Sequence, residues 1–322
     1  MEILALHPGA LGDIILSLPA LAILRDRYPD ARITLAADTD FAVVAASGYA
    51  ERILSISSLP LHRLFGTEDV SLDDERFWHS YDRIVSWTGS GHESFAARLA
   101  RLHPHVVVGG WKPGIGEQRH VARLFLDSLK PWLTPPSVTP VPHIQLAPSV
   151  LAEGKEWLRE QGWHGARPLF AIHPGAGSAA KRWPLSNFGE LARGLSVQGD
   201  LLIIEGPAEP GSGRGLAAEL GAGARLACNL PLPGLAAALA QCRAFVGNDS
   251  GIAHLAAGIG IPCVVLFGPT SPQHWAPLGS QVSTLRDDRD CHACKENAGD
   301  GHTCLENIPV QVVQAELLRL IS

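Results

Sequence analysis

The sequence predicts an α/β fold with two doubly wound domains, each built on a parallel sheet. In both halves of the 322-residue chain, short apolar runs of strand length alternate with segments of helical length. A proline-rich stretch over residues 131–149 separates the halves, and His-Pro-Gly-Ala follows the first predicted strand of each, at His7 and at His173. Because ligands of such sheets bind where the strands end, we expect two domains that face a central cleft.

The first half opens with a buried strand over residues 3–6, a glycine-bearing turn and a helix over residues 14–24. A short apolar run bounded by glycine and proline is typical of a central parallel strand. The alternation continues with strands over 32–37, 83–87 and 106–108, and with helices over 41–49 and 93–102.

Six prolines then interrupt the pattern between residues 131 and 149. Proline fixes the backbone and removes amide donors, which favours an extended linker. We therefore place an N-terminal domain over residues 1–148 and a C-terminal domain over residues 149–322.

The second half repeats the alternation. The predicted strands cover residues 169–172, 201–204, 244–246 and 263–267, and the helices cover 149–161, 187–196, 235–240 and 250–259. A final amphipathic helix is expected over residues 310–321.

Composition excludes several classes of protein. A net charge of -6 and a pI near 6.1 argue against nucleic acid as the main partner. Six cysteines are too few for a disulfide scaffold. No apolar run reaches the roughly 18 residues of a membrane-spanning helix, and the start of the chain lacks the basic region of a signal peptide. We expect a cytoplasmic protein, with peripheral membrane contact left open.

The segment after the strand at 244–246 is the strongest candidate site. Asp249 and Ser250 have the character of helix-cap residues, and small residues at the start of the helix leave its amides open. Such an N-terminus suits a phosphate, and His254 lies one turn further on. The alternative is a well-capped helix whose histidine packs in the core.

A second candidate is the Gly/Ser turn over residues 175–178 with Lys181 behind it. Backbone amides can wrap one phosphate and the ammonium can reach another. The segment is not a Walker A motif, because the GK[ST] ending is missing. The alternative is a solvated surface loop.

The third candidate is Gly9–Asp13. GALGD contains only part of the dinucleotide fingerprint, and Asp13 would repel a pyrophosphate placed there. The carboxylate suits a base better, unless it only complements the helix dipole. The three segments together suggest a nucleotide-sugar donor in the C-terminal half and an acceptor hydroxyl activated from the N-terminal half.

The sequence resembles glycosyltransferase family nine, the lipopolysaccharide heptosyltransferases. The resemblance rests on GALGDIILSLPAL, HPGAGSAAKRWP, GNDSGIAHLAAGIGIPCVVLFGPTSPQHWAPLG and CHACKENAGDGHTCLENIPVQVV. It implies a GT-B fold of two Rossmann-like domains, with the final helix packing back on the first. It also implies an inverting, metal-independent transfer of heptose from ADP-heptose to a Kdo or heptose sugar of the lipopolysaccharide inner core.

Roles carry over from the family residue by residue. Asp13 would be the catalytic base, and Lys181, Ser178 and Gly177 would hold the diphosphate. The amides of Ser250 and Gly251, with His254, would complete this cradle. Asp249 would bind hydroxyls of the donor sugar. Glu209 would bind the ribose, although relatives often have glycine where Glu205 stands, so that either glutamate could serve.

No cofactor is expected, because lysine, histidine and helix amides can stabilise a leaving diphosphate without a metal. An acidic pair of the kind that binds a divalent cation occurs among Asp287, Asp288 and Asp290. These residues lie far from the motifs, in a polar stretch that we expect to be a solvated loop. Cys291, Cys294 and Cys304, with His292 or His302, could bind a structural zinc, but their spacing is irregular. Reduced thiols and a disulfide are the alternatives, and we expect Cys228, Cys242 and Cys263 in the core.

Gly12, His92 and Arg119 are candidates for binding the anionic acceptor, although each could equally lie on an ordinary polar surface. The expected partners are the ADP-sugar donor and a lipopolysaccharide-core or other glycan acceptor. We expect a cytoplasmic monomer, with peripheral contact at the cytoplasmic face of the inner membrane left open. The alternative hypotheses are a glycosyltransferase of the same family that uses another nucleotide sugar, a GT-B nucleotide-sugar epimerase or hydrolase, and a binding module without catalytic activity. A nicotinamide-dependent oxidoreductase, in which Asp38 would bind the ribose, is a further alternative.

Overall fold

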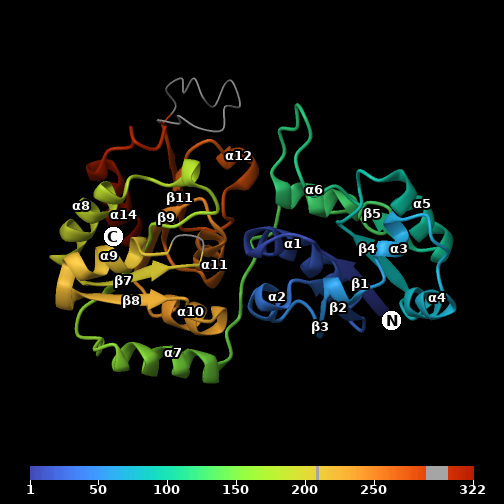
Figure 1. Cartoon of the computed structure of the whole chain (residues 1–322), viewed down its shortest axis with the longest axis horizontal. Coiled ribbons are helices and arrows are strands. Elements are labelled where there is room, and N and C mark those ends of the chain that lie inside the picture. Colours follow the sequence, from blue (N-terminus) through green and yellow to red (C-terminus); the bar gives the residue numbers. More distant parts are fainter. Residues whose placement is uncertain (208–209, 288–303) are drawn as a thin grey trace. The chain divides into compact units, whose positions relative to one another are not determined.

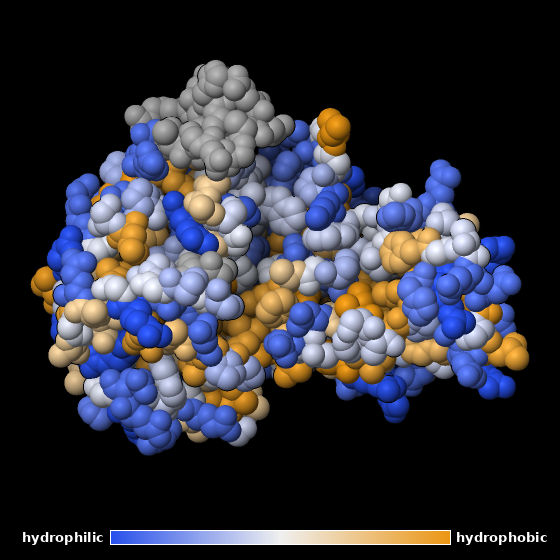
Figure 2. Space-filling view, viewed as in Figure 1, coloured by the Kyte–Doolittle hydropathy of each residue, from blue (hydrophilic) through white to orange (hydrophobic). Residues whose placement is uncertain are grey.

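A computed structural model describes residues 1–207, 210–287 and 304–322, and Figure 1 shows its strands and helices. The chain forms two compact units, Met1–Ile144 and Gln145–Ser322, and the division falls inside the predicted linker. On the face that Figure 2 shows, hydrophilic side chains are widespread in both units and are mixed with hydrophobic ones. Among the described residues, no helix has both the length and the apolar character needed to cross a membrane.

The first unit contains a parallel sheet of five strands in the order β3-β2-β1-β4-β5, with helices on both faces (Figure 1). Its strands are β1 (Glu2–Leu6), β2 (Arg32–Ala37), β3 (Arg52–Ser55), β4 (Arg83–Ser86) and β5 (Val106–Val108). Its helices are α1 (Leu11–Arg27), α2 (Thr39–Ala45), η1 (Ile56–Ser58), α3 (His62–Phe65), α4 (Leu72–His79), α5 (Glu93–Leu102) and α6 (Val121–Ser128).

The second unit contains a parallel sheet of six strands in the order β11-β10-β9-β6-β7-β8. Its strands are β6 (Leu169–His173), β7 (Asp200–Glu205), β8 (Ala224–Cys228), β9 (Ala244–Asn248), β10 (Cys263–Phe267) and β11 (Val282–Arg286). Its helices are α7 (Pro148–Glu160), η2 (Ala179–Lys181), α8 (Leu185–Ser196), α9 (Ser212–Leu220), η3 (Gly221–Gly223), α10 (Leu232–Leu239), α11 (Gly251–Ile259), α12 (Pro272–Trp275) and α14 (Val310–Ile321).

Helix α14 packs within the second unit. Its buried residues Val310, Val313 and Leu317 join the core that also holds residues of α8, β9 and β10. Its apolar face therefore has its partner, α8 and the neighbouring strands, within the same unit. That the helix also packs back on the first domain stays a prediction.

Several helices and strands were not predicted from the sequence, because they are short or polar. Helix α4 buries only Trp78, although a reciprocal cap between Ser71 and Asp74 fixes its start. The edge strand β8 is only half-buried along most of its length. Apolar periodicity is weak in such elements, so tertiary packing decides them.

Both sheets reverse their strand order beside their first strand. The chain runs from β1 to β2 and β3 on one side and then returns to β4 on the other, and β6 lies in the same way between β7 and β9. The two His-Pro-Gly-Ala segments begin at these reversal points, with His7 after β1 and His173 at the end of β6. In open α/β sheets, ligands bind at such points.

Helix α7 lies so close to α10 that only glycine fits at the contact. A Cβ built on Gly154 would lie 2.5 Å from the carbonyl carbon of Ala237 and 2.8 Å from its oxygen. Gly215, on α9, would meet nothing within 4 Å.

We therefore predict opposite effects of the same substitution at these two helical glycines. Gly154→Ala should lower the free energy of unfolding by about 1–3 kcal/mol through overpacking. Gly215→Ala should raise it by about 0.5–1 kcal/mol, because alanine loses less backbone entropy than glycine in a helix. Urea unfolding of both variants measures this, and equal effects would show that α7 and α10 are not in such close contact.

Candidate active site

The polar residues of the second unit concentrate at the reversal point between β6 and β9. β6 ends at His173, β9 ends at Asn248, and Asp249 follows at once. All three side chains are buried or nearly so, among strands whose buried residues are mostly apolar. Buried polar groups of this kind need partners, and their partners define the site.

Asn248 bonds to both ends of the loop over residues 174–183, which contains the predicted phosphate-binding turn and is called the phosphate loop below. Its Nδ2 donates to the carbonyl of Pro174 at 2.8 Å, and its Oδ1 accepts from the amide of Trp183 at 3.0 Å. Gly177 and Lys181 lie in the chain between these two attachment points. A buried carboxamide thus fixes the loop against the end of β9.

Lys181 forms an ion pair with Asp249. Its Nζ lies 2.8 Å from Oδ2 of Asp249, which also accepts a hydrogen bond of 2.6 Å from the hydroxyl of Thr270. Asp249 is only 6% exposed, whereas the Lys181 side chain is 30% exposed. The carboxylate therefore holds the ammonium group in place at a position that solvent still reaches.

Ser250 begins α11 as its cap. Its hydroxyl accepts from the amide of Ala253 at 3.4 Å and lies 3.3 Å from Nδ1 of His173. The first amides of the helix, including that of Gly251, have no acceptor within the helix. His254 is buried on the first turn. A positive helix end, with His173 next to its cap, thus follows Asp249 directly in the chain.

The turn before Lys181 leaves its backbone approachable. Gly177 and Ser178 are exposed, and a Cβ built on Gly177 would meet nothing within 4 Å. Among the described residues, nothing therefore requires glycine there. A ligand that lies against the backbone would supply such a requirement.

The two glutamates proposed for the ribose differ in what the structure says of them. Glu205 is buried, and its carboxylate accepts from the amides of Gly211 and Arg214 and from the thiol of Cys228. Burial raises its pKa, but these donors outweigh it and lower the pKa below its ordinary value. Glu205 therefore serves the start of α9, and Glu209 lies outside the described residues.

In the first unit, Asp13 lies in the first turn of α1, where the turn after β1 contacts its carboxylate. Its Oδ2 accepts from the amide of Ala10 at 3.0 Å. A Cβ on Gly9 would lie 2.5 Å from Cβ of Asp13 and 2.8 Å from its Oδ2. Glycine at position 9 is thus a condition for the position of the Asp13 carboxylate.

His7 supports the same turn from below. Its Nδ1 accepts from the amide of Gly9 at 3.1 Å, and its ring lies among Trp87, Trp111 and Phe125, at centroid distances of 5.8, 6.3 and 5.3 Å. Burial lowers the pKa of His7 from 6.5 to about 3, which outweighs a hydrogen bond with the Asp13 backbone that raises it. His7 is therefore neutral at ordinary pH.

The three acceptor candidates lie at different places in the first unit. Gly12 is the second residue of α1. His92 precedes α5, with its ring against Phe65 at 5.1 Å. Arg119 bonds to carboxylates of Glu117 and Asp127 at 2.6 and 2.8 Å, so that its charge is compensated within the protein. The role of each toward an acceptor stays a prediction.

The residues considered for metals lie mostly outside the described chain. Cys291 and Cys294 belong to that part, as do His292 and His302, whereas Cys304 is described and buried. Cys242 and Cys263 are buried and Cys228 is half-buried. Within the described ranges, no group of three or more His, Cys, Asp or Glu side chains has the geometry to hold a metal ion.

Sequence reasoning gave no role to Asn248, Thr270 or His7. Asn248 stands out only as a polar residue that closes an apolar strand. Thr270 comes 21 residues after Asp249 in the chain, and nothing in the local pattern links the two. These partners become visible only once the loops after β6, β9 and β10 meet at one edge of the sheet.

The depressed pKa of His7 predicts a loss of stability in acid. His7 takes up a proton near pH 6.5 in the unfolded chain, but only near pH 3 in the folded unit. The free energy of unfolding therefore decreases as the pH falls through this range. His7→Asn keeps an acceptor for Gly9 and removes the titration. Between pH 7 and pH 5 the wild type should lose about 2 kcal/mol more than this variant in urea unfolding.

Exposed His164 provides the control, because His164→Asn should keep the wild-type pH dependence. If His7→Asn retains the wild-type pH dependence as well, burial of a neutral His7 is not the cause of that dependence.

Known proteins resemble this chain over its whole length. Residues 113–301 match the family model described as glycosyltransferase family 9 (heptosyltransferase). The chain is 28% identical to lipopolysaccharide heptosyltransferase 2 of Salmonella typhimurium over 100% of this chain and 99% of the relative. It is 27% identical to lipopolysaccharide heptosyltransferase 2 of Escherichia coli over the same shares.

Solved structures show the same fold. A glycosyl transferase of family 9 from Veillonella parvula superposes with a TM-score of 0.82 at 19% identity, over 99% of this chain and 97% of the other. The ADP-heptose lipopolysaccharide heptosyltransferase II of E. coli gives a TM-score of 0.78 at 22% identity, over 100% and 98%. The two parallel-sheet units are thus those of a GT-B fold. The chain belongs to glycosyltransferase family 9, the heptosyltransferases, and is a glycosyltransferase.

Proposed function

We propose that this enzyme transfers a heptose from ADP-heptose to a sugar hydroxyl of the lipopolysaccharide inner core, with inversion at the anomeric carbon. The names of its relatives support the sugar and the acceptor. The observation that carries the proposal is the Lys181–Asp249–Thr270 cluster beside the start of α11, at the reversal point of the second sheet.

The second unit suits a sugar diphosphate. The ammonium of Lys181 and the open amides of α11 offer positive charge to the two phosphates. The exposed backbone around Gly177 and Ser178 allows a phosphate to approach closely. Asp249 accepts hydroxyl donors, as its bond from Thr270 shows, and would accept from the hydroxyls of the donor sugar.

In the proposed reaction, the carboxylate of Asp13 removes the proton from the acceptor hydroxyl. The oxygen then attacks the anomeric carbon on the face opposite to the diphosphate. The new carbon–oxygen bond forms as the bond to the diphosphate breaks, and ADP leaves with the electron pair. Lys181, His254 and the amides of Ser250 and Gly251 stabilise the charge that develops on the leaving group.

We further propose that these groups serve in place of a divalent cation, so that the enzyme needs no cofactor. We also propose that the reaction takes place in the cytoplasm, at the cytoplasmic face of the inner membrane. A monomer would carry all the groups that this mechanism names, since Asp13 and Lys181 belong to one chain.

We predict that ADP binds in the presence of EDTA and that the phosphate loop controls its affinity. Lys181→Ala should weaken ADP binding about 10- to 100-fold, because a charge-assisted contact is lost. Gly177→Ala should weaken it without loss of stability, since its Cβ meets no protein atom. Titration calorimetry measures both, with exposed Lys155→Ala and Gly215→Ala as matched controls. Binding only with magnesium would contradict the metal-free cradle, and a preference for UDP, GDP or NADH would contradict the donor.

We also predict that Asp13→Asn abolishes transfer but not donor binding. Asparagine keeps an acceptor for the Ala10 amide and cannot serve as the base, so kcat should fall about 10²- to 10⁴-fold. The assay follows transfer of heptose to purified inner-core acceptors, with ADP affinity measured on the same preparation. Full activity of this variant would remove Asp13 from the mechanism. Turnover of the donor without acceptor would favour an epimerase or hydrolase.

A further inference from the structure

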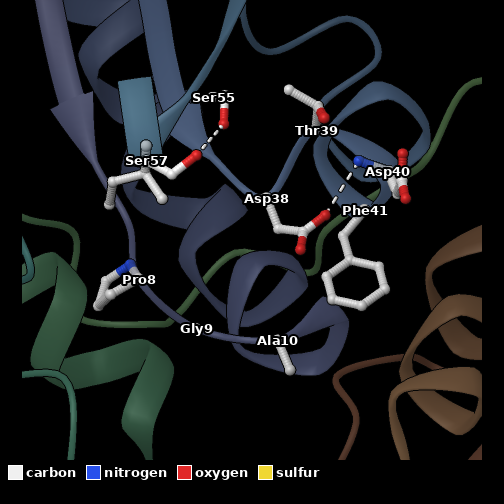
Figure 3. Close-up of a pocket in the computed structure, with 10 residues that line it drawn as sticks. Pro8, Gly9, Ala10, Asp38, Thr39, Asp40, Phe41, Ser55 and Ser57 are labelled. Atoms are coloured by element: carbon white, nitrogen blue, oxygen red, sulfur yellow. Dashed lines mark hydrogen bonds between the residues drawn. The ribbon is translucent and has the colours of Figure 1, made fainter. Parts of the chain in front are cut away.

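The first unit contains a pocket that the mechanism above does not use. It has a volume of about 460 Å³ and is formed by the loops that follow β1, β2 and β3, which are neighbours in the sheet. Figure 3 shows the carboxylate of Asp38 next to the ring of Phe41, near Gly9 and Ala10, while the carboxylate of Asp40 points away. The pocket thus opens at the carboxyl edge of the sheet, where ligands of α/β domains bind.

The lining of this pocket is polar, with a single aromatic ring. Oδ1 of Asp38 accepts from the amide of Asp40 at 3.0 Å, and among the described residues no donor reaches its Oδ2. The hydroxyls of Ser55 and Ser57 lie 2.8 Å apart on the opposite loop. Phe41 is half-buried and presents apolar surface. Arginine, lysine and histidine are absent from the residues that line the pocket.

The pocket shares a wall with the proposed base. Gly9 and Ala10 line it, and the amide of Ala10 donates to Asp13 at 3.0 Å. A molecule in the pocket would therefore lie against the turn that holds the Asp13 carboxylate. The pocket and the Asp13 carboxylate lie on either side of Gly9 and are close together, because a Cβ built on Gly9 would be 2.8 Å from Oδ2 of Asp13.

We propose that this pocket binds an uncharged sugar ring of the acceptor and selects against an anionic one. The free oxygen of Asp38 accepts hydrogen bonds from ring hydroxyls, Phe41 packs against the C–H face of the ring, and the serine hydroxyls exchange hydrogen bonds with its edge. A carboxylate or phosphate in the same place would face Asp38 with no cation in the lining to balance it. The inference rests on the proposed function, because it names the acceptor class of the same site.

The test uses Asp38→Asn in the full-length chain. Asparagine is as good a helix cap as aspartate, so α2 keeps its start, but the negative charge is gone. Asp69→Asn removes the same charge from an exposed position that has no hydrogen bond or ion pair among the described residues. The donor is ADP-heptose. Two acceptor oligosaccharides are compared, one that ends in an uncharged heptose and one that ends in a carboxylated sugar.

The wild type should use the heptose-ended acceptor with at least tenfold higher kcat/KM. Asp38→Asn should raise the KM for this acceptor about tenfold with little change in kcat. It should also reduce the ratio of kcat/KM between the heptose-ended and the carboxylated acceptor. Asp69→Asn should behave as wild type. Equal kinetics for the two variants, or a wild-type preference for the carboxylated acceptor, would overturn the proposal.

A second measurement separates this inference from the proposed function. Saturation-transfer NMR detects binding of the heptose-ended oligosaccharide to the full chain without any donor. If no transfer occurs, the proposed function fails, and loss of the NMR signal in Asp38→Asn alone would still support the pocket. If transfer occurs but the signal is the same in Asp38→Asn and Asp69→Asn, only the pocket assignment fails.

Discussion

The buried side chain of Asn248 is the interaction on which the candidate active site depends. It bonds to Pro174 at one end of the phosphate loop and to Trp183 at the other, so a single carboxamide fixes a loop that has little regular structure of its own. Because these bonds are shielded from water, they hold their geometry better than surface contacts would. Lys181 in that loop and Asp249 after Asn248 are thereby brought together.

The two units carry complementary chemistry. The second offers an ammonium group, helix amides and histidines, which suit a diphosphate that leaves with negative charge. The first offers carboxylates at strand ends, with Asp13 after β1 and Asp38 after β2. A carboxylate can act as a base and can accept hydrogen bonds from sugar hydroxyls. The carboxylate in the second unit, Asp249, is paired with Lys181.

The repeated His-Pro-Gly-Ala segments show how one sequence pattern serves different purposes. Each follows the first strand of its sheet, at the reversal point. His7 is neutral among aromatic rings and supports the turn that positions Asp13. His173 contacts the hydroxyl of Ser250 at the start of α11. The same turn therefore supports the Asp13 carboxylate in one unit and a helix N-terminus in the other.

Local signals, namely buried apolar runs and the glycine turns after them, were enough to predict the α/β class, the central strands β1, β6, β9 and β10, and the candidate segments around Asp13, Lys181 and Asp249. The remaining features depend on contacts between distant parts of the chain. Contacts such as Thr270 with Asp249 join residues far apart in the chain, and the packing of α14 on its own unit depends on which apolar face lies nearest. The pocket at Asp38 likewise exists only because three loops meet at one edge of a sheet, and the order of strands in a sheet is not written in any local pattern.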